Sequence, residues 1–150
     1  MQSRFNFIED KENRLLIVRP VGDIPGDLFA QHVIEAYRGV EMPWTYNRII
    51  DMRRHTGHVE DKDRGAIAKV WAELTAGISY RAYVAMLMRH TYEKVRLPQI
   101  STDFPNETIC VFNDYHEAVG WVLAPDRMQF LAGHGDAPPT GQDGAEIEIQ

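Results

Sequence analysis

The sequence predicts a single α/β domain built on a mixed, mostly parallel five-stranded sheet flanked by about four helices. Strand-like and helix-like apolar segments alternate along the chain in the order ββαβαβαβα. The segment 80–88 is apolar at both alternating sets of positions, as expected for a strand covered on both faces. A length of 150 residues fits one domain. Strands separated by helices favour parallel pairing through right-handed crossovers.

The first two strands are predicted to form a hairpin. The apolar segments at 5–7 and 15–18 are separated by the polar stretch 9–13, which is typical of a turn. We expect Pro20 and Gly22 to end the second strand. The first strand then adds an antiparallel edge to the sheet.

Two amphipathic helices are expected on either side of a third strand. Residues 28–37 have apolar side chains at helical spacing after a turn, and Gly39 is a suitable stop. The third strand, within 46–52, contains Ile49 and Ile50 and carries Asp51 near its carboxyl end. The second helix has one apolar face, formed by Ile67, Val70, Trp71, Leu74 and Ile78.

The last third of the chain predicts a weak helix, a strand and a final helix. Thr91 could cap a third helix that Pro98 interrupts. The fifth strand is expected over 108–112. Asp114 and Glu117 then form a capping-box pattern at the start of the last helix.

The domain is expected to span residues 1–132, followed by a flexible acidic tail over 133–150. The net charge is −6, and four of these negative charges lie in 131–150, which has no Lys or Arg. The remainder is nearly balanced and lacks the basic face that nucleic acid requires. The composition of the tail predicts mobility, although Ile147 and Ile149 could add a strand to a neighbour's sheet.

Cysteine content and hydropathy indicate a cytoplasmic protein. The single cysteine, Cys110, excludes an intramolecular disulfide and lies in an apolar strand, where a packing role is favoured over a catalytic one. No apolar run approaches the ~20 residues of a membrane span. The first residues are not followed by the apolar core of a signal peptide.

Three segments, taken in order, resemble the SpoIIAA-like family of the STAS superfamily (the sulphate transporter and anti-sigma factor antagonist domains). The closest resemblance is over 111–123, VFNDYHEAVGWVL, where a strand, a Phe, an acidic cap, Glu-Ala and a Trp follow one another. The segment 49–53, IIDMR, is similar to the family's apolar strand ending in Asp-x-Arg. The segment 16–18, leading to Gly22 and a helix, is the third. The resemblance covers roughly residues 5–124 and implies a small mixed sheet and a regulatory or binding role.

One feature of the family is missing. Phosphorylatable antagonists of the superfamily have Asp-Ser-Ser-Gly or Asp-Ser-Thr-Gly where the second helix begins. Here the corresponding residues 60–65 read EDKDRG and contain no hydroxyl group. The phosphorylatable serine of the family is therefore absent at this position, and only Thr56 lies nearby.

The loop after the third strand is the candidate binding site. It lies beyond the carboxyl end of a strand, where open α/β sheets place their ligands. The candidate partner- or ligand-binding residues are Asp51, Arg53, Arg54, His55, His58, Asp61, Lys62 and Asp63. Within this set, His55 and His58 are weak candidates for metal ligands, since imidazoles and carboxylates can bind zinc. The simpler interpretation is a polar loop that precedes a helix.

These observations predict a non-enzymatic STAS-like module that binds a protein partner or a small apolar or anionic ligand. No cofactor is expected, and a homodimer is one possible assembly. The alternative is a small metal-binding protein or enzyme that uses Asp51, His55, His58 and Asp61.

Overall fold

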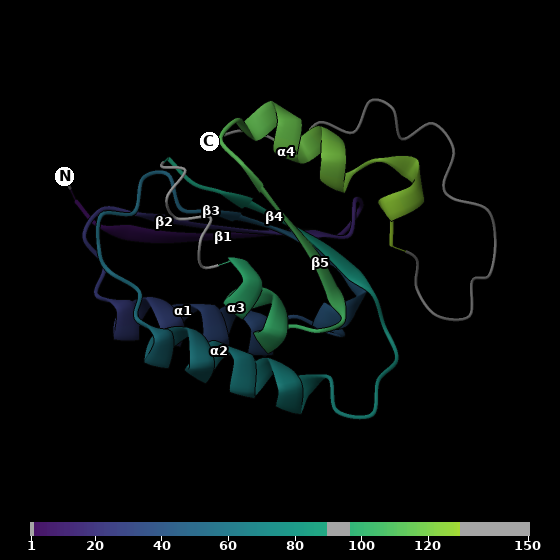
Figure 1. Cartoon of the computed structure of the whole chain (residues 1–150), viewed down its shortest axis with the longest axis horizontal. Coiled ribbons are helices and arrows are strands. Elements are labelled where there is room, and N and C mark those ends of the chain that lie inside the picture. The colour runs from purple at the N-terminus through teal and green to yellow at the C-terminus, as the bar shows by residue number, and fades with distance from the viewer. Residues whose placement is uncertain (1, 90–96, 130–150) are drawn as a thin grey trace.

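The computed structural model describes residues 2–89 and 97–129, and Figure 1 shows their arrangement. Five strands form one sheet in the order β1-β2-β3-β4-β5. β1 pairs antiparallel with β2, and the other three pairings are parallel. The strands are β1 (Arg4–Asp10), β2 (Leu15–Val21), β3 (Asn47–Asp51), β4 (Ala82–Leu87) and β5 (Glu107–Phe112).

Four α-helices cover the two faces of the sheet. They are α1 (Gly26–Arg38), α2 (Asp61–Leu74), α3 (Leu97–Asp103) and α4 (Tyr115–Val122), with short 3₁₀ turns at Pro43–Thr45 and Pro125–Arg127. Figure 1 shows α1, α2 and α3 on one face and α4 alone on the other. The predicted fold class and the order ββαβαβαβα are confirmed. Within the described residues, no helix has the length and apolar character needed to span a bilayer.

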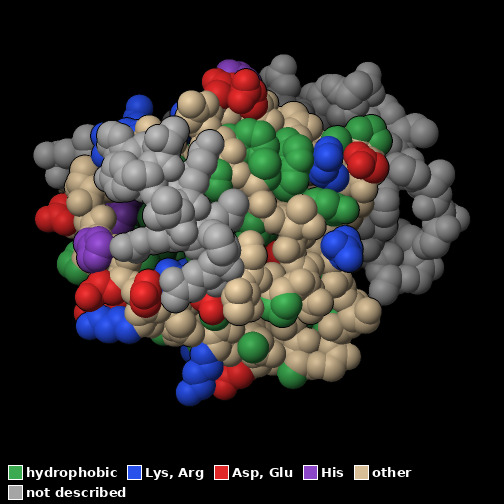
Figure 2. Space-filling model, viewed as in Figure 1, with side chains coloured by type: hydrophobic (Ala, Val, Ile, Leu, Met, Phe, Trp, Pro, Cys, Tyr) green, Lys and Arg blue, Asp and Glu red, His purple; other side chains and the backbone are tan. Residues whose placement is uncertain are grey.

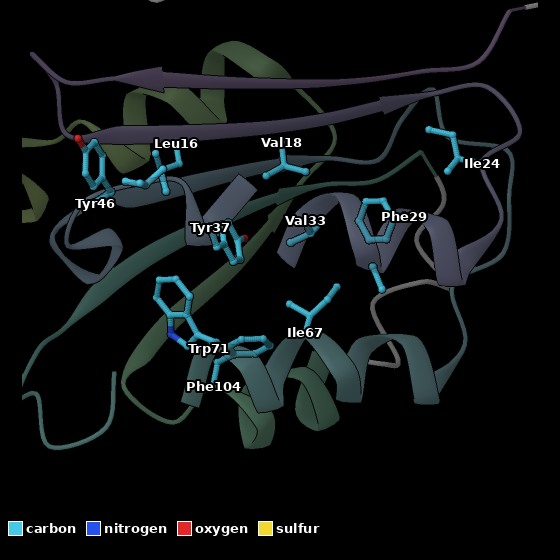
Figure 3. Close-up of a cluster of buried hydrophobic side chains, with 12 residues drawn as sticks. Leu16, Val18, Ile24, Phe29, Val33, Tyr37, Tyr46, Ile67, Trp71 and Phe104 are labelled. Carbon is cyan, nitrogen blue, oxygen red and sulfur yellow. The ribbon is translucent and has the colours of Figure 1, made fainter. Parts of the chain in front are cut away.

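Alternating side chains of the sheet enter two separate cores. The larger lies between the sheet and helices α1 to α3, and Figure 3 shows several of its members facing one another: Phe29, Val33, Tyr37, Ile67, Trp71 and Phe104. The smaller lies under α4, where Ala118 and Val122 pack on Ile17, Ile49 and Leu87. β2 is buried along its whole length because both cores use it.

One predicted boundary is wrong because it misjudges a proline. Pro20 does not end β2, which continues to Val21, directly before Gly22; its pairing with β3 ends at Val18, so the missing N–H removes no bond from that ladder. Pro98 lies within the described part of α3. The expected helix from Thr91 through Val95 lies outside the described residues.

One buried amide links the segment after α4 to the amino-terminal ends of the parallel strands. The Asn47 side chain donates to the backbone carbonyls of Val122 and Arg127. Its oxygen accepts from the backbone N–H of Tyr83 at 3.0 Å and from the side chain of Gln129 at 2.8 Å. A single residue of β3 thereby connects β4, α4 and the segment that follows.

Trp71 provides a test of the larger core. Its side chain is 2% exposed, and its indole N–H donates to the Tyr80 hydroxyl at 2.8 Å. We expect Trp71→Ala to lower the free energy of unfolding by ~3–5 kcal/mol, the usual cost of a large truncation in a core. Urea unfolding measures the change, with the exposed Leu28→Ala as a control expected to cost under ~0.5 kcal/mol. Equal losses in the two variants would contradict the packing described here.

Candidate functional site

The loop between β3 and α2, residues 52–60, extends the sheet at the carboxyl ends of the strands. The backbone N–H of Gly22 donates to the carbonyl of Arg54 at 2.9 Å, and the N–H of Thr56 donates to the carbonyl of Gly22 at 3.0 Å. Gly22 and His55 thus form a parallel bridge. Because both sides of this bridge are backbone, the loop has a fixed position relative to β2.

His55 anchors the loop from inside. Its side chain is buried, Nε2 lies 2.8 Å from the carbonyl oxygen of Ile24, and the ring packs 5.6 Å from that of Phe29. Gly57 follows at a point where a Cβ would collide with the Ile24 carbonyl. The loop therefore lies against the segment that leads into α1, and only a glycine fits at this approach.

A cavity of about 750 Å³ opens beside this loop and extends between the sheet and helices α1, α2 and α3. Its walls are mostly aliphatic, aromatic and methionine side chains: Val18, Phe29, Val33, Ile50, Met52, Val59, Ile67, Val84, Met86, Met88, Ile100 and Phe104. His55, Thr56, Gly57 and His58 from the loop also line it, together with Arg64 and Arg89. Several of the wall residues are labelled in Figure 3. A volume of this size matches pockets that take small molecules, about 300–1,000 Å³.

A buried arginine lies in the wall of this apolar cavity. Arg48 of β3 is 3% exposed and forms an ion pair with Glu107 of β5, whose carboxylate is also buried. A second N–H of Arg48 donates to the Tyr37 hydroxyl at 3.3 Å. Its guanidinium lies 4.3 Å from the ring centre of Trp71. Charge, hydrogen bond and ring contact together hold the guanidinium at one position.

The Arg48–Glu107 pair leaves one donor unused. The Nε of Arg48 is buried and has no hydrogen-bond partner among the described residues. Burial raises the pKa of the Tyr37 hydroxyl despite the opposing effect of Arg48, and it likewise raises the pKa of Tyr80. Both phenols therefore stay neutral in the physiological range. The cavity lining thus combines apolar side chains with the neutral Tyr37 hydroxyl and with Arg48, whose buried Nε has no partner among the described residues.

The predicted site residues Asp51 and Arg53 lie apart from this cavity, on the α4 side of the sheet. Asp51 is 3% exposed and accepts from Nε of Arg53 at 2.9 Å and from Nε of Arg19 at 3.3 Å. Both guanidinium groups lie near the ring of Tyr115 in α4. This cluster ties the ends of β2 and β3 to the start of α4.

The other predicted residues divide between the cavity mouth and the start of α2. His58 is exposed at the mouth, and Arg54 is exposed beside it. Asp61 begins α2, and Asp63 is buried, accepting from the backbone N–H of Glu60 at 2.9 Å. Lys62 is exposed, with its amine 3.6 Å from the Glu60 carboxylate.

The predicted residues do not form one metal centre. Across residues 2–89 and 97–129, no three His, Cys, Asp or Glu side chains gather in a way that could hold a metal ion. Asp51 and His55 are engaged by different partners on different sides of the sheet. The polar-loop interpretation thus accounts for Asp51, His55 and Asp63, each of which has a structural contact.

Sequence reasoning missed the most unusual group at the site, Arg48. A signal was available, since a charged residue directly precedes Ile49 and Ile50 in an interior strand. Its partner Glu107 begins a strand 59 positions later, and nothing local in the sequence joins the two. A cation in an apolar strand indicates either a buried ion pair or a ligand.

Comparison with known proteins identifies the fold. No protein-family model and no curated protein matches the chain. Among solved structures it is similar to an uncharacterised protein of the DUF3478 family with a SpoIIAA-like fold from Shewanella loihica PV-4. The identity is 16%, the TM-score is 0.53, and the match covers 79% of this chain and 92% of that one. The chain has a SpoIIAA-like fold, as the resemblance implied.

The Asp51 cluster predicts a dependence of stability on acid pH. Burial opposes ionisation of Asp51, but the hydrogen bonds from Arg53 prevail and the pKa is lowered. A lowered native pKa contributes stability that is full above the unfolded value of ~3.9 and is lost as the pH falls through the native value. We expect the advantage of wild type over Asp51→Asn, measured by urea unfolding, to shrink from pH 6 to pH 3.

The exposed Asp126→Asn provides the control for this titration, because its carboxylate is 77% exposed. Its difference from wild type should stay small throughout. A gap between wild type and Asp51→Asn that does not change with pH would show that the ion pairs are not the source of the stabilisation.

The Arg48–Glu107 pair predicts strongly non-additive mutations. Arg48→Met leaves the Glu107 carboxylate buried and uncompensated, which should lower the free energy of unfolding by ~3–5 kcal/mol. Adding Glu107→Gln removes the charge but keeps an oxygen acceptor for the Tyr80 hydroxyl, which lies 3.2 Å from the Glu107 carboxylate in the wild-type structure. The double variant should therefore be more stable than Arg48→Met alone. Simple addition of the two single losses in chemical unfolding would contradict a direct pair.

Proposed function

We propose that the protein binds a small, largely apolar molecule in the cavity between the sheet and helices α1 to α3. The ligand has an oxygen acceptor at its inner end, which takes the hydrogen bond that Arg48 Nε leaves unused. The observation that carries this proposal is an apolar cavity of about 750 Å³ lined by Arg48, whose buried Nε has no hydrogen-bond partner among the described residues. Buried donors normally have partners, and an unpaired one costs about 1–3 kcal/mol.

The charge at the cavity wall favours a neutral or weakly charged acceptor. Glu107 already neutralises Arg48, so a full anion would meet a pair with no net charge. The mouth offers a different environment, since Arg89 is exposed there and Arg64 is half-buried. A molecule with a second, more polar end at the mouth suits both regions.

The lining supports binding as the activity of the module. In the described part of the chain, the cavity walls contain no serine, cysteine or carboxylate, and the exposed side chains of Thr56 and His58 form no hydrogen bond with each other, so no nucleophile is paired with a base there. Nε2 of His55 faces the Ile24 carbonyl oxygen. A non-enzymatic binding module with a SpoIIAA-like fold is consistent with these side chains.

A matched pair of fluorescent probes tests the proposal. 6-Propionyl-2-dimethylaminonaphthalene and 2-dimethylaminonaphthalene share one aromatic framework and are both neutral, and only the first has a carbonyl oxygen that can accept a hydrogen bond. Both should bind the wild-type protein, because both fill apolar space. Val84→Phe, which fills the cavity from β4, should weaken the binding of both by about tenfold or more. Val119→Phe on α4, on the opposite face of the sheet, should leave both affinities within about twofold.

Arg48→Lys separates the two parts of the proposal. Lysine retains the charge beside Glu107 but has no group equivalent to Nε. We expect it to weaken the binding of the probe that has the carbonyl several-fold and to leave the binding of the probe without it unchanged. Unaltered binding of both probes by Val84→Phe, with the fold intact by circular dichroism, would place the binding outside the cavity and overturn the proposal.

A further inference from the structure

β5 is an edge strand with an apolar sequence. It pairs with β4 on one side, and no strand of the described residues lies on its other side. Ile109, Cys110, Val111 and Phe112 are all half-buried. The strand contains no lysine, proline or bulge of the kind that protects free edges.

At this edge the backbone of β5 presents hydrogen-bonding groups that have no partner strand among residues 2–89 and 97–129. The N–H of Met88 donates to the carbonyl of Phe112 at 3.0 Å, so the backbone groups of Phe112 face β4 in the parallel pairing. Alternate residues of a strand direct their backbone groups to opposite sides. Consequently the N–H and C=O groups of Ile109 and Val111 face away from β4.

A line of acidic, aromatic and basic side chains runs beside this edge. Trp121 of α4 packs 5.6 Å from Phe112, so this side of the helix faces β5. Glu117 lies one turn earlier on the same side and is exposed. Arg127 places its guanidinium 5.0 Å from the Trp121 ring centre, with one nitrogen 3.7 Å from the exposed Asp126 carboxylate. Figure 2 shows hydrophobic side chains gathered on the surface where α4 lies over the sheet.

The order of these charges along the strand is self-complementary. Glu117 belongs to the first turn of α4, which follows the carboxyl end of β5. Arg127 also contacts Tyr83, which is in register with Thr108 near the amino end of β5. A two-fold axis beside the middle of β5 would exchange these ends and bring each Glu117 toward the other chain's Arg127.

We propose that β5 is a homodimer interface, in which the β5 strands of two copies pair antiparallel about an axis at Cys110. In this register Ile109 of each copy pairs with Val111 of the other, and the two outward-facing backbones exchange hydrogen bonds. The Glu107 carboxylate is held by Arg48 within its own chain, so no unpaired like charges meet. The result is a continuous ten-stranded sheet with two-fold symmetry.

The chain's single cysteine reports directly on this register. The two copies of Cys110 would form a pair without backbone hydrogen bonds, with Cα atoms about 4.5 Å apart. That separation lies within the range that a disulfide spans, about 4.4–6.8 Å. Oxidation of the full-length protein with copper–phenanthroline should give a disulfide-linked dimer on a non-reducing gel. Cys110→Ser should give no such product yet remain a dimer by light scattering.

Two further sets of variants test the interface without the thiol. Val111→Pro removes an outward N–H and leaves the ladder with β4 intact, so it should weaken dimerisation by about tenfold or more, with the fold checked by circular dichroism. Arg127→Glu and Glu117→Arg should each weaken the dimer, and the double variant should restore it. Such rescue requires that the two side chains meet across the interface.

Three results would overturn the proposal. One is a monomer by light scattering at micromolar concentrations, whether the edge is free or is paired with residues 130–150 of its own chain. Another is a dimer that resists cross-linking and survives Val111→Pro, which would use another surface. The third is a double charge variant that dimerises no better than the single variants.

Discussion

The ion pair between Arg48 and Glu107 is the constraint on which the rest of the structure depends. It crosses β4 and joins β3 to β5 on the face that carries the larger core. Its burial requires compensation, which Tyr37, Trp71 and Tyr80 provide from α1, α2 and the approach to β4. Helices and sheet are therefore positioned around one guanidinium group. The Nε of the same group has no partner among the described residues, so the proposed function gives one residue both a structural role and a binding role.

The apolar cavity lies beside a closely packed part of the structure. α1 and α2 are drawn together at their amino-terminal ends, where Gly26 lies so close to Asp63 that a Cβ could not be accommodated. The loop residues His55 and Gly57 press against the same segment near Ile24. Beyond this close contact the cavity extends to Ile100 of α3 and to Phe104. An ion pair between Arg64 and Asp103 joins α2 to α3.

The sequence predicted the elements far better than the site. Hydrophobic periodicity specifies which segments are strands and helices, because each must bury one face, and the order ββαβαβαβα follows from it. The partners of a buried side chain can be far away in the sequence, and this limited the prediction of the site. Asp51 and His55 are four positions apart but engage partners on different sides of the sheet. Arg48 and Glu107 are distant in sequence, and only the folded chain shows that they meet.

The Asn47 side chain has a consequence for access to the cavity. It fixes Gln129 at the amino-terminal ends of the parallel strands, whereas the cavity opens beside the loop at their carboxyl-terminal ends. The polypeptide therefore leaves the described part of the domain at the pole opposite the cavity mouth. The segment from α4 to Gln129 does not narrow access to the cavity, and one amide provides that spatial separation.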